Sequence, residues 1–226
     1  MLLVVLAVAP GAFWLWYFLQ RDRLRPEPRH LIRRVFLLGG GAAIVAGVVE
    51  LAVFAAAGIQ VGQAGLGGAV VAATIIAVIE EGLKFATVYY GVYRNPECNE
   101  VLDGIIYAVA ASLGFATVEN IGYVLGGGVG IGIMRAILSV PGHAFFGALM
   151  GFYIGVAKCS ASGATRLLAR GLVVAIIAHA AYDAVLFTGT FLALAVFPIV
   201  VVLWWRATLH TRRALAMDNE RLGPAV

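Results

Sequence analysis

The feature that most constrains this sequence is the pentad Glu80-Glu81-Gly82-Leu83-Lys84, which lies inside an otherwise apolar run from about Ala69 to Gly91. Charged side chains are costly there, because one ionisable group at the centre of a bilayer costs about 2.5–3.5 kcal/mol on insertion scales. Ionisable residues within a membrane segment therefore mark a functional site by default. The pentad predicts a membrane enzyme whose other helices bring partners to Glu80 and Glu81.

The composition agrees with a membrane protein. Of the 226 residues, 62% are hydrophobic and only 12% are charged, which is outside the range of soluble globular domains. The net charge of +4 comes from separated basic blocks rather than one patch, so it does not indicate nucleic-acid binding. Cys98 and Cys159 fall in different polar loops, which indicates neither a disulfide nor a cysteine metal site.

The apolar stretches predict an all-α polytopic transmembrane bundle, since about 20 residues suffice for one crossing. Seven stretches qualify, and they run roughly over 2–19, 33–57, 69–91, 104–125, 132–157, 170–188 and 190–207. The short last connection leaves open a re-entrant pair in place of the final two spans. We expect one membrane-embedded domain over 1–226, a catalytic core of about 69–188, and a cytoplasmic tail over 208–226 that extends the last helix and frays.

The basic residues predict the orientation of the bundle in the cell membrane of a bacterium or archaeon. Lys and Arg occur in the connections after the first, third and fifth spans and in the tail, and the other connections carry none. Basic connections face the cytoplasm, so the N-terminus should lie outside and the C-terminus inside. Residues 1–19 should be a retained anchor rather than a signal peptide, because their charges follow the apolar run instead of preceding it.

Polar residues inside the predicted spans should converge at one level. With a rise of about 1.5 Å per residue, Glu80, His143 and His179 lie roughly 14–17 Å from the outer ends of their spans. Glu119 and Asp183 lie roughly 8 Å deep by the same measure. Pro141 should kink the fifth span just before His143 and free backbone carbonyls there. This agreement in depth predicts one site that is reached from the outer face.

The residue types in this predicted site favour hydrolysis. Two imidazoles with carboxylates are the ligand types of catalytic zinc, which lowers the pKa of water. We expect Glu80 or Glu81 to be the general base, with Lys84 and Asp183 also catalytic. The candidate metal ligands are Glu119, His143 and His179. The sequence lacks the H-E-x-x-H zinc signature, so dependence on Zn²⁺ stays open at this point.

In chain order, the motifs resemble those of the PrsW family of intramembrane proteases. They are Glu80-Glu81-x-x-Lys84, Phe115-x-x-x-Glu119-Asn120, His143 in the fifth span, and His179-x-x-x-Asp183. The related CAAX-processing and bacteriocin-immunity proteases usually read Glu-Glu-x-x-x-Arg and end His-x-x-x-Asn, so Lys84 and Asp183 favour the PrsW family here. The resemblance implies site-1 cleavage of a single-span anti-sigma factor near its extracytoplasmic face, by a bilayer-embedded enzyme classed as a metalloprotease by analogy. It also implies that Glu80, Glu81 and His179 match the essential positions.

Other interpretations of the same residues exist. Glu80 and Glu81 could form a structural ion pair with Lys84, and Arg135 could neutralise Glu119. Glu50 could pair with Arg135 or face water. Asn120 fits a helix–helix hydrogen bond, His210 a solvated side chain, and the Gly147, Gly151, Gly155 track internal packing. The rival functions are a CAAX-type or immunity-type glutamic protease without metal, a proton-coupled transporter with a Glu/His relay, and a helper subunit with a relic site.

Overall fold

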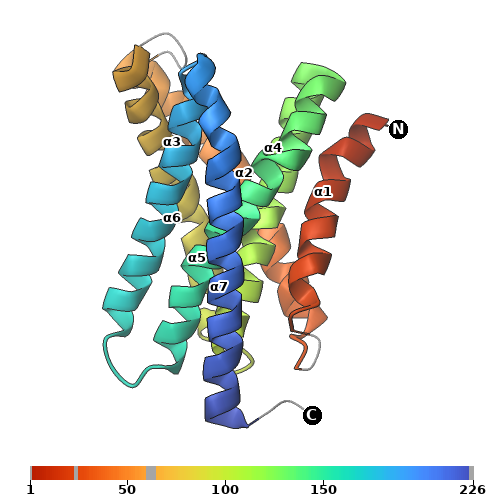
Figure 1. The fold of residues 1–226 in the computed structure, drawn as a ribbon, viewed down its shortest axis with the longest axis vertical. Helices are drawn as coiled ribbons and strands as arrows, with labels where there is room; N and C mark the ends of the chain where they lie inside the picture. The colour runs from red at the N-terminus through yellow and green to blue at the C-terminus, as the bar shows by residue number, and fades with distance from the viewer. Residues whose placement is uncertain (1, 23–24, 60–64, 224–226) are drawn as a thin grey trace.

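The structure is a computed structural model that describes residues 2–22, 25–59 and 65–223. Within those residues every regular element is a helix, which confirms the all-α bundle (Figure 1). The elements are α1 (Leu2–Leu19), α2 (Arg29–Ala57), α3 (Gly65–Val88), η1 (Tyr89–Tyr93), α4 (Val101–Ile137), α5 (Ser139–Cys159), α6 (Ala164–Phe187), η2 (Phe191–Ala195) and α7 (Val196–Leu222). The start of α1 and the end of α7 lie at opposite ends of the bundle (Figure 1).

Six segments of the described residues are long and apolar enough to cross a membrane, whereas we predicted seven. The difference lies in Val101–Cys159, a continuous segment of 59 residues that contains both α4 and α5. Gly128 leaves helical geometry within it, with φ 71° and ψ −162°, and Arg135 returns to within 2.8 Å of Glu119. The predicted fourth and fifth spans therefore belong to one folded-back hairpin.

The α4–α5 hairpin forms the core, and close backbone contact holds its two arms together. A side chain at Gly151 would overlap the backbone of Gly104 and Ile105, and one at Gly155 would overlap the backbone of Val101. Lipid is as apolar as the side chains, so helices in a membrane associate through close packing, and small residues permit that packing. The predicted glycine track on the fifth span is thus confirmed as internal packing.

A second close crossing sets the position of α2 against α4. A Cβ at Gly39 would meet the carbonyl of Ala111, and a Cβ at Gly114 would meet the carbonyl of Phe36. Gly39 lies on α2 and Gly114 lies on α4, so each helix has a glycine where the backbone of the other approaches. This crossing fixes the helix that carries Glu50.

Pro141 interrupts the helix as predicted. Its ring excludes the carbonyl of the residue four positions earlier, which is Ile137. The observed break follows, because α4 ends at Ile137 and α5 begins at Ser139. Pro141 consequently lies in the first turn of α5, and His143 lies just beyond it.

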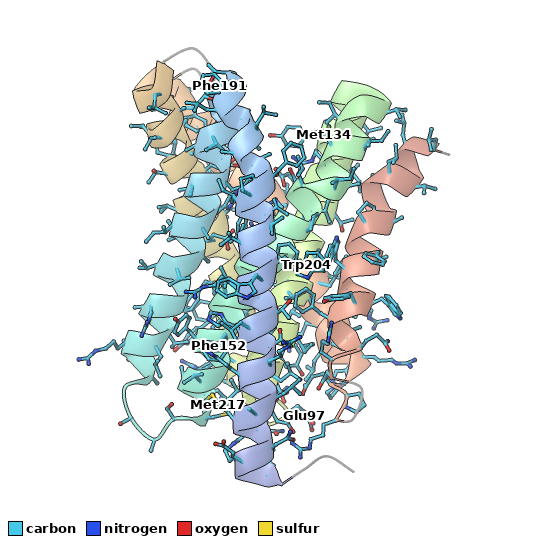
Figure 2. All side chains as sticks on the ribbon, in the orientation of Figure 1. Glu97, Met134, Phe152, Phe191, Trp204 and Met217 are labelled. Carbon is cyan, nitrogen blue, oxygen red and sulfur yellow. The ribbon has the colours of Figure 1, made fainter. Side chains whose placement is uncertain are left out.

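The C-terminal segment contradicts two of our predictions. α7 continues to Leu222 instead of fraying, and Asp218 is only 1% exposed. Its carboxylate accepts hydrogen bonds from the backbone N–H groups of Val101 (2.7 Å) and Leu102 (2.9 Å), which otherwise lack helical partners. His210 is buried rather than solvated, and its ring stacks on Phe152 at 4.4 Å. The end of α7 near Met217 thus lies beside the loop that carries Glu97 (Figure 2).

Two buried acids at this end lie between α1 and α2. Asp22 accepts a hydrogen bond from the Glu27 N–H at 3.0 Å, and Tyr107 of α4 donates to the Glu27 carboxyl. Burial raises the pKa of Asp22 to about 7. Burial also raises the pKa of Glu27 to about 9, with a further contribution from its hydrogen bond to Asp103. At neutral pH the Glu27 carboxyl is therefore protonated, and its hydrogen bond with Tyr107 holds the connection between α1 and α2 against α4.

Candidate active site

Lys84 is the hub of the polar cluster inside the bundle. Its Nζ lies 2.9 Å from Glu80 Oε2, 2.8 Å from Glu81 Oε1 and 2.9 Å from His143 Nδ1. The two glutamates reach it because they precede it by four and three positions on α3, which places all three on adjoining faces. Lys84 and Glu81 are 0% exposed, so one ammonium compensates two buried carboxylates. The predicted ion pair is therefore present and involves both glutamates.

His143 is held at both ring nitrogens. An ammonium group has only donors, so Nδ1 must accept from Lys84. Nε2 then carries the hydrogen of the neutral ring and faces Glu119 Oε2 at 3.0 Å. A metal ion could use His143 only if one of these hydrogen bonds broke. The ligand role of His143 therefore stays a prediction.

His179 is also contacted at both ring nitrogens, in this case by two carboxylates. Nδ1 lies 2.9 Å from Glu81 Oε1, and Nε2 lies 3.3 Å from Asp183 Oδ2. A lone pair facing a carboxylate is unfavourable, so each nitrogen needs a proton or a cation on that side. Asp183 lies one turn beyond His179 on α6, which suits the orienting partner that ligand histidines usually have. Phe146 stacks on the ring at 4.7 Å and fixes its plane.

One group of the described residues has the spacing of a metal site. Donor atoms of Glu80, Glu81 and His179 all lie within 4.8 Å of one another, and all three residues are buried. Carboxylate oxygen and imidazole nitrogen are ligands that zinc accepts, so these donors fit the ion. The group shares only His179 with the ligand set predicted from sequence. His143 is connected to this group through Lys84, and Glu119 is connected through His143.

Glu119 is part of a chain that reaches α1. It lies 2.8 Å from Arg135 Nη2 as well as 3.0 Å from His143 Nε2, so the pairing with Arg135 that the sequence left open is present. Arg135 Nε also donates to Asn120 Oδ1 at 2.9 Å. Asn120 in turn donates to the carbonyls of Leu6 (3.1 Å) and Ala7 (3.0 Å), as expected for a helix–helix hydrogen bond.

The sequence motifs did not point to α1, but its proline gives a physical signal. Pro10 lies inside α1 and has no N–H. The Leu6 carbonyl, four residues earlier, consequently lacks its helical donor and takes one from Asn120 instead.

A cavity of about 470 Å³ adjoins the cluster. Its titratable and polar lining consists of Glu50, Glu80, Glu119, Tyr123, Arg135, Ser139, His143, His179, Tyr182 and Asp183. Glu80 therefore faces the cavity, whereas Glu81 is not part of the lining. The cavity also extends to Met134, which lies toward one end of the bundle (Figure 2).

Sequence reasoning undervalued two residues of this lining. Glu50 makes no ion pair with Arg135 within the described residues, and its buried Oε1 has no hydrogen-bond partner there. Tyr182 lies 3.2 Å from Ser139 through its hydroxyl group. An isolated Glu in an apolar span was the available signal for Glu50, whereas nothing in the sequence singled out Tyr182.

The predicted convergence is present in space. α3, α4, α5 and α6 each contribute at least one of the seven candidate residues to a continuous hydrogen-bonded cluster. The rings of His143 and His179 are 5.4 Å apart. The site is thus a buried set of acids, imidazoles and one ammonium, open on the Glu80 side to the cavity.

Comparison with known proteins gives consistent matches over nearly the whole chain. A family profile described as PrsW family intramembrane metalloprotease matches residues 27–206. Protease PrsW of Geobacillus kaustophilus (strain HTA426) is 35% identical over 228 residues, covering 99% of this chain and 97% of the relative. Protease PrsW of Bacillus subtilis (strain 168) is 35% identical over 212 residues, covering 93% and 94%. No solved structure matches.

Proposed function

This chain belongs to the PrsW family of intramembrane proteases, and we propose that Glu80, Glu81, Lys84, His179 and Asp183 are its catalytic residues. The reaction is hydrolysis of a peptide bond in a membrane-anchored protein. The observation that carries this proposal is the cluster around Lys84, which joins α3 to α5 and lies against a cavity. All seven candidate residues fall within the catalytic core that we propose, about 69–188.

The geometry favours different roles for the two glutamates. Glu80 lines the cavity and can accept a proton from a water there, as a general base must. Glu81 is occupied by Lys84 and His179 and serves to hold both. The activated water attacks the peptide carbonyl, the C–N bond breaks, and the proton that Glu80 took from the water passes to the leaving amine.

The outer residues position this machinery. Asp183 orients His179, while Glu119 and Arg135 hold His143 in the tautomer that accepts from Lys84. Lys84 offsets the negative charge of two carboxylates in a buried site, where an unpaired charge is very costly. The arrangement is therefore organised before substrate binds, which is what electrostatic catalysis requires.

We further propose that zinc assists the reaction. Glu80, Glu81 and His179 are the residues that would hold the ion, because their donors lie close enough together. Bound there, Zn²⁺ would supply a Lewis acid that lowers the pKa of water. One observation favours the metal-free alternative, a glutamic protease: Lys84 Nζ already lies within 2.9 Å of both carboxylates.

The substrate that fits this site is a single-span membrane protein of the anti-sigma-factor type, cleaved near its extracytoplasmic face. The cavity extends to Met134, at the end of the bundle opposite the basic connections (Figure 2). By the positive-inside rule this end faces outward, with the N-terminus outside and the C-terminus cytoplasmic. Accessibility of single cysteines placed at Gly58 and Asn219 to an impermeant reagent in intact cells tests this orientation.

The catalytic proposal is tested with purified protein in nanodiscs and a single-span anti-sigma-factor reporter. Glu80→Gln, Glu81→Gln and His179→Ala should abolish cleavage, while Glu97→Gln and His30→Ala, at exposed positions, should not. Full cleavage by the Glu80 and Glu81 variants would refute the proposal.

Metal content of the same preparations separates the two mechanisms. If zinc assists, the parent should hold one zinc ion per chain and His179→Ala should lose it. A metal-free parent that cleaves at full rate in the presence of a chelator would instead establish the glutamic mechanism.

A further inference from the structure

A groove between α1 and α2 lies on the outside of the bundle, away from the catalytic cavity. It has a volume of about 490 Å³ and is lined by Val8, Ala12, Leu15, Leu19, Arg29, Ile32, Arg33 and Phe36. Both helices pack on α4 but touch each other at few positions, so the space between them is left open. Six of these eight lining residues are apolar, and the two arginines are neighbours on α2.

The two arginines give the groove a charged end. Arg29 and Arg33 are one turn apart on α2, so they share one helix face at a separation of about 5–6 Å between Cβ atoms. Both are exposed. Within the described residues, neither has a carboxylate oxygen within 4 Å. Two guanidinium groups without a counterion therefore stand at the edge of an apolar channel.

The length of the groove matches one leaflet. Val8 and Leu19 are separated by eleven positions, which is about 16 Å at 1.5 Å per residue. Half of a hydrocarbon core of about 30 Å is about 15 Å. The arginines lie in the first two turns of α2, directly after the loop that joins α1 to α2. The dimensions suit an acyl chain in the groove and its headgroup at the arginines.

We propose that this groove is a binding site for one anionic phospholipid. The acyl chain lies along Ala12, Leu15 and Ile32, and the phosphate accepts hydrogen bonds from Arg29 and Arg33. Basic residues near a membrane surface attract anionic lipids, and a guanidinium binds a phosphate through two parallel hydrogen bonds. A zwitterionic lipid would fill the same groove but gain less, because its own ammonium group offsets its phosphate.

The test uses native mass spectrometry of the full chain in detergent, with dioleoylphosphatidylglycerol or dioleoylphosphatidylcholine added. The parent should bind one phosphatidylglycerol preferentially. Arg29→Gln with Arg33→Gln should weaken that binding about 30-fold, at roughly fivefold for each lost basic contact. The matched control is Arg166→Gln with Arg170→Gln, which removes two exposed arginines with the same spacing on α6, and it should leave binding unchanged.

Two further measurements decide between the lipid and other occupants. Inorganic phosphate at millimolar concentration should not displace the lipid, since the apolar lining contributes to binding; displacement would mean a bare phosphate site and would overturn the proposal. Leu15→Trp, which fills the groove without removing charge, should also reduce binding. Equal binding of both lipids would show that the protein carries only general boundary lipid. An equal loss of phosphatidylglycerol binding in the Arg29/Arg33 and Arg166/Arg170 double variants would show the same.

Discussion

Replacing Lys84 by methionine tests the charge balance of the site most directly. The substitution keeps the length of the side chain and removes the only ammonium within hydrogen-bond distance of Glu80 and Glu81 in the described residues. Removing one partner of a buried ion pair costs about 3–5 kcal/mol, because the other charge is left without compensation. His143 Nδ1 loses its donor as well. We therefore expect the free energy of unfolding to fall by about 3–5 kcal/mol, together with loss of cleavage.

A second substitution shows whether this loss comes from charge. Adding Glu80→Gln to Lys84→Met removes one of the two uncompensated carboxylates and should recover roughly half of the lost stability, which a double-mutant cycle measures. Lys158→Met, at the chain's other lysine, is the control; it removes hydrogen bonds to backbone carbonyls and a contact with the Tyr93 ring but no ion pair within the described residues, and it should cost about 1–2 kcal/mol. The assay is reversible unfolding in mixed micelles followed by circular dichroism.

The reasoning about Lys84 would be refuted in either of two ways. One is a Lys84→Met protein as stable as the parent. The other is a double variant less stable than the single variant, since that would mean that Glu80 is stabilised by something other than the ammonium group.

Three further predictions follow from the described contacts. Gly114→Ala should destabilise the α2–α4 crossing by about 1–3 kcal/mol, whereas Gly122→Ala on the same helix meets nothing within 4 Å and should be neutral or slightly stabilising in thermal unfolding. Because burial raises the pKa of Glu27 from 4.5 to about 9, the folded protein keeps this proton longer than the unfolded chain; stability measured against pH should therefore fall between about 4.5 and 9, and Glu27→Gln should flatten that fall. Asp183→Asn should lower cleavage about 10- to 100-fold by releasing His179, and an unchanged kcat would contradict the orienting role.

The sequence was sufficient to bring the acids and imidazoles to one level, for a physical reason. Helix rise is fixed, so depth follows from position along a span, and Glu80, His143 and His179 meet as expected. Rotation about each helix axis is set by packing against neighbours and cannot be counted from the chain. That is why the sequence alone did not show that Glu80 lines the cavity and Glu81 does not, or that His143 is contacted at both ring nitrogens.

Long-range contacts limited the remaining predictions. The tail was expected to fray because it is polar. Its Asp218, however, accepts a hydrogen bond from the backbone N–H of Val101 at the start of α4, 117 residues earlier in the chain. The apolar pattern predicts spans over 104–125 and 132–157 but does not show that they lie in one continuous segment of 59 residues, in which Gly128 supplies the reversal. Pro141, by contrast, interrupts the helix in which it lies, so this break could be predicted from the neighbouring residues alone.

The hydrogen bonds from Asn120 to the carbonyls of Leu6 and Ala7 have a consequence for shortened versions of this enzyme. The region that matches the family profile begins at residue 27, so a chain cut there would retain every catalytic candidate. The Asn120 amide would nevertheless lose its two hydrogen-bond acceptors on α1. Asn120 contacts Arg135, and Arg135 contacts Glu119, the carboxylate beside His143. α1, a helix without a single acid or imidazole, thus supports the candidate site from outside.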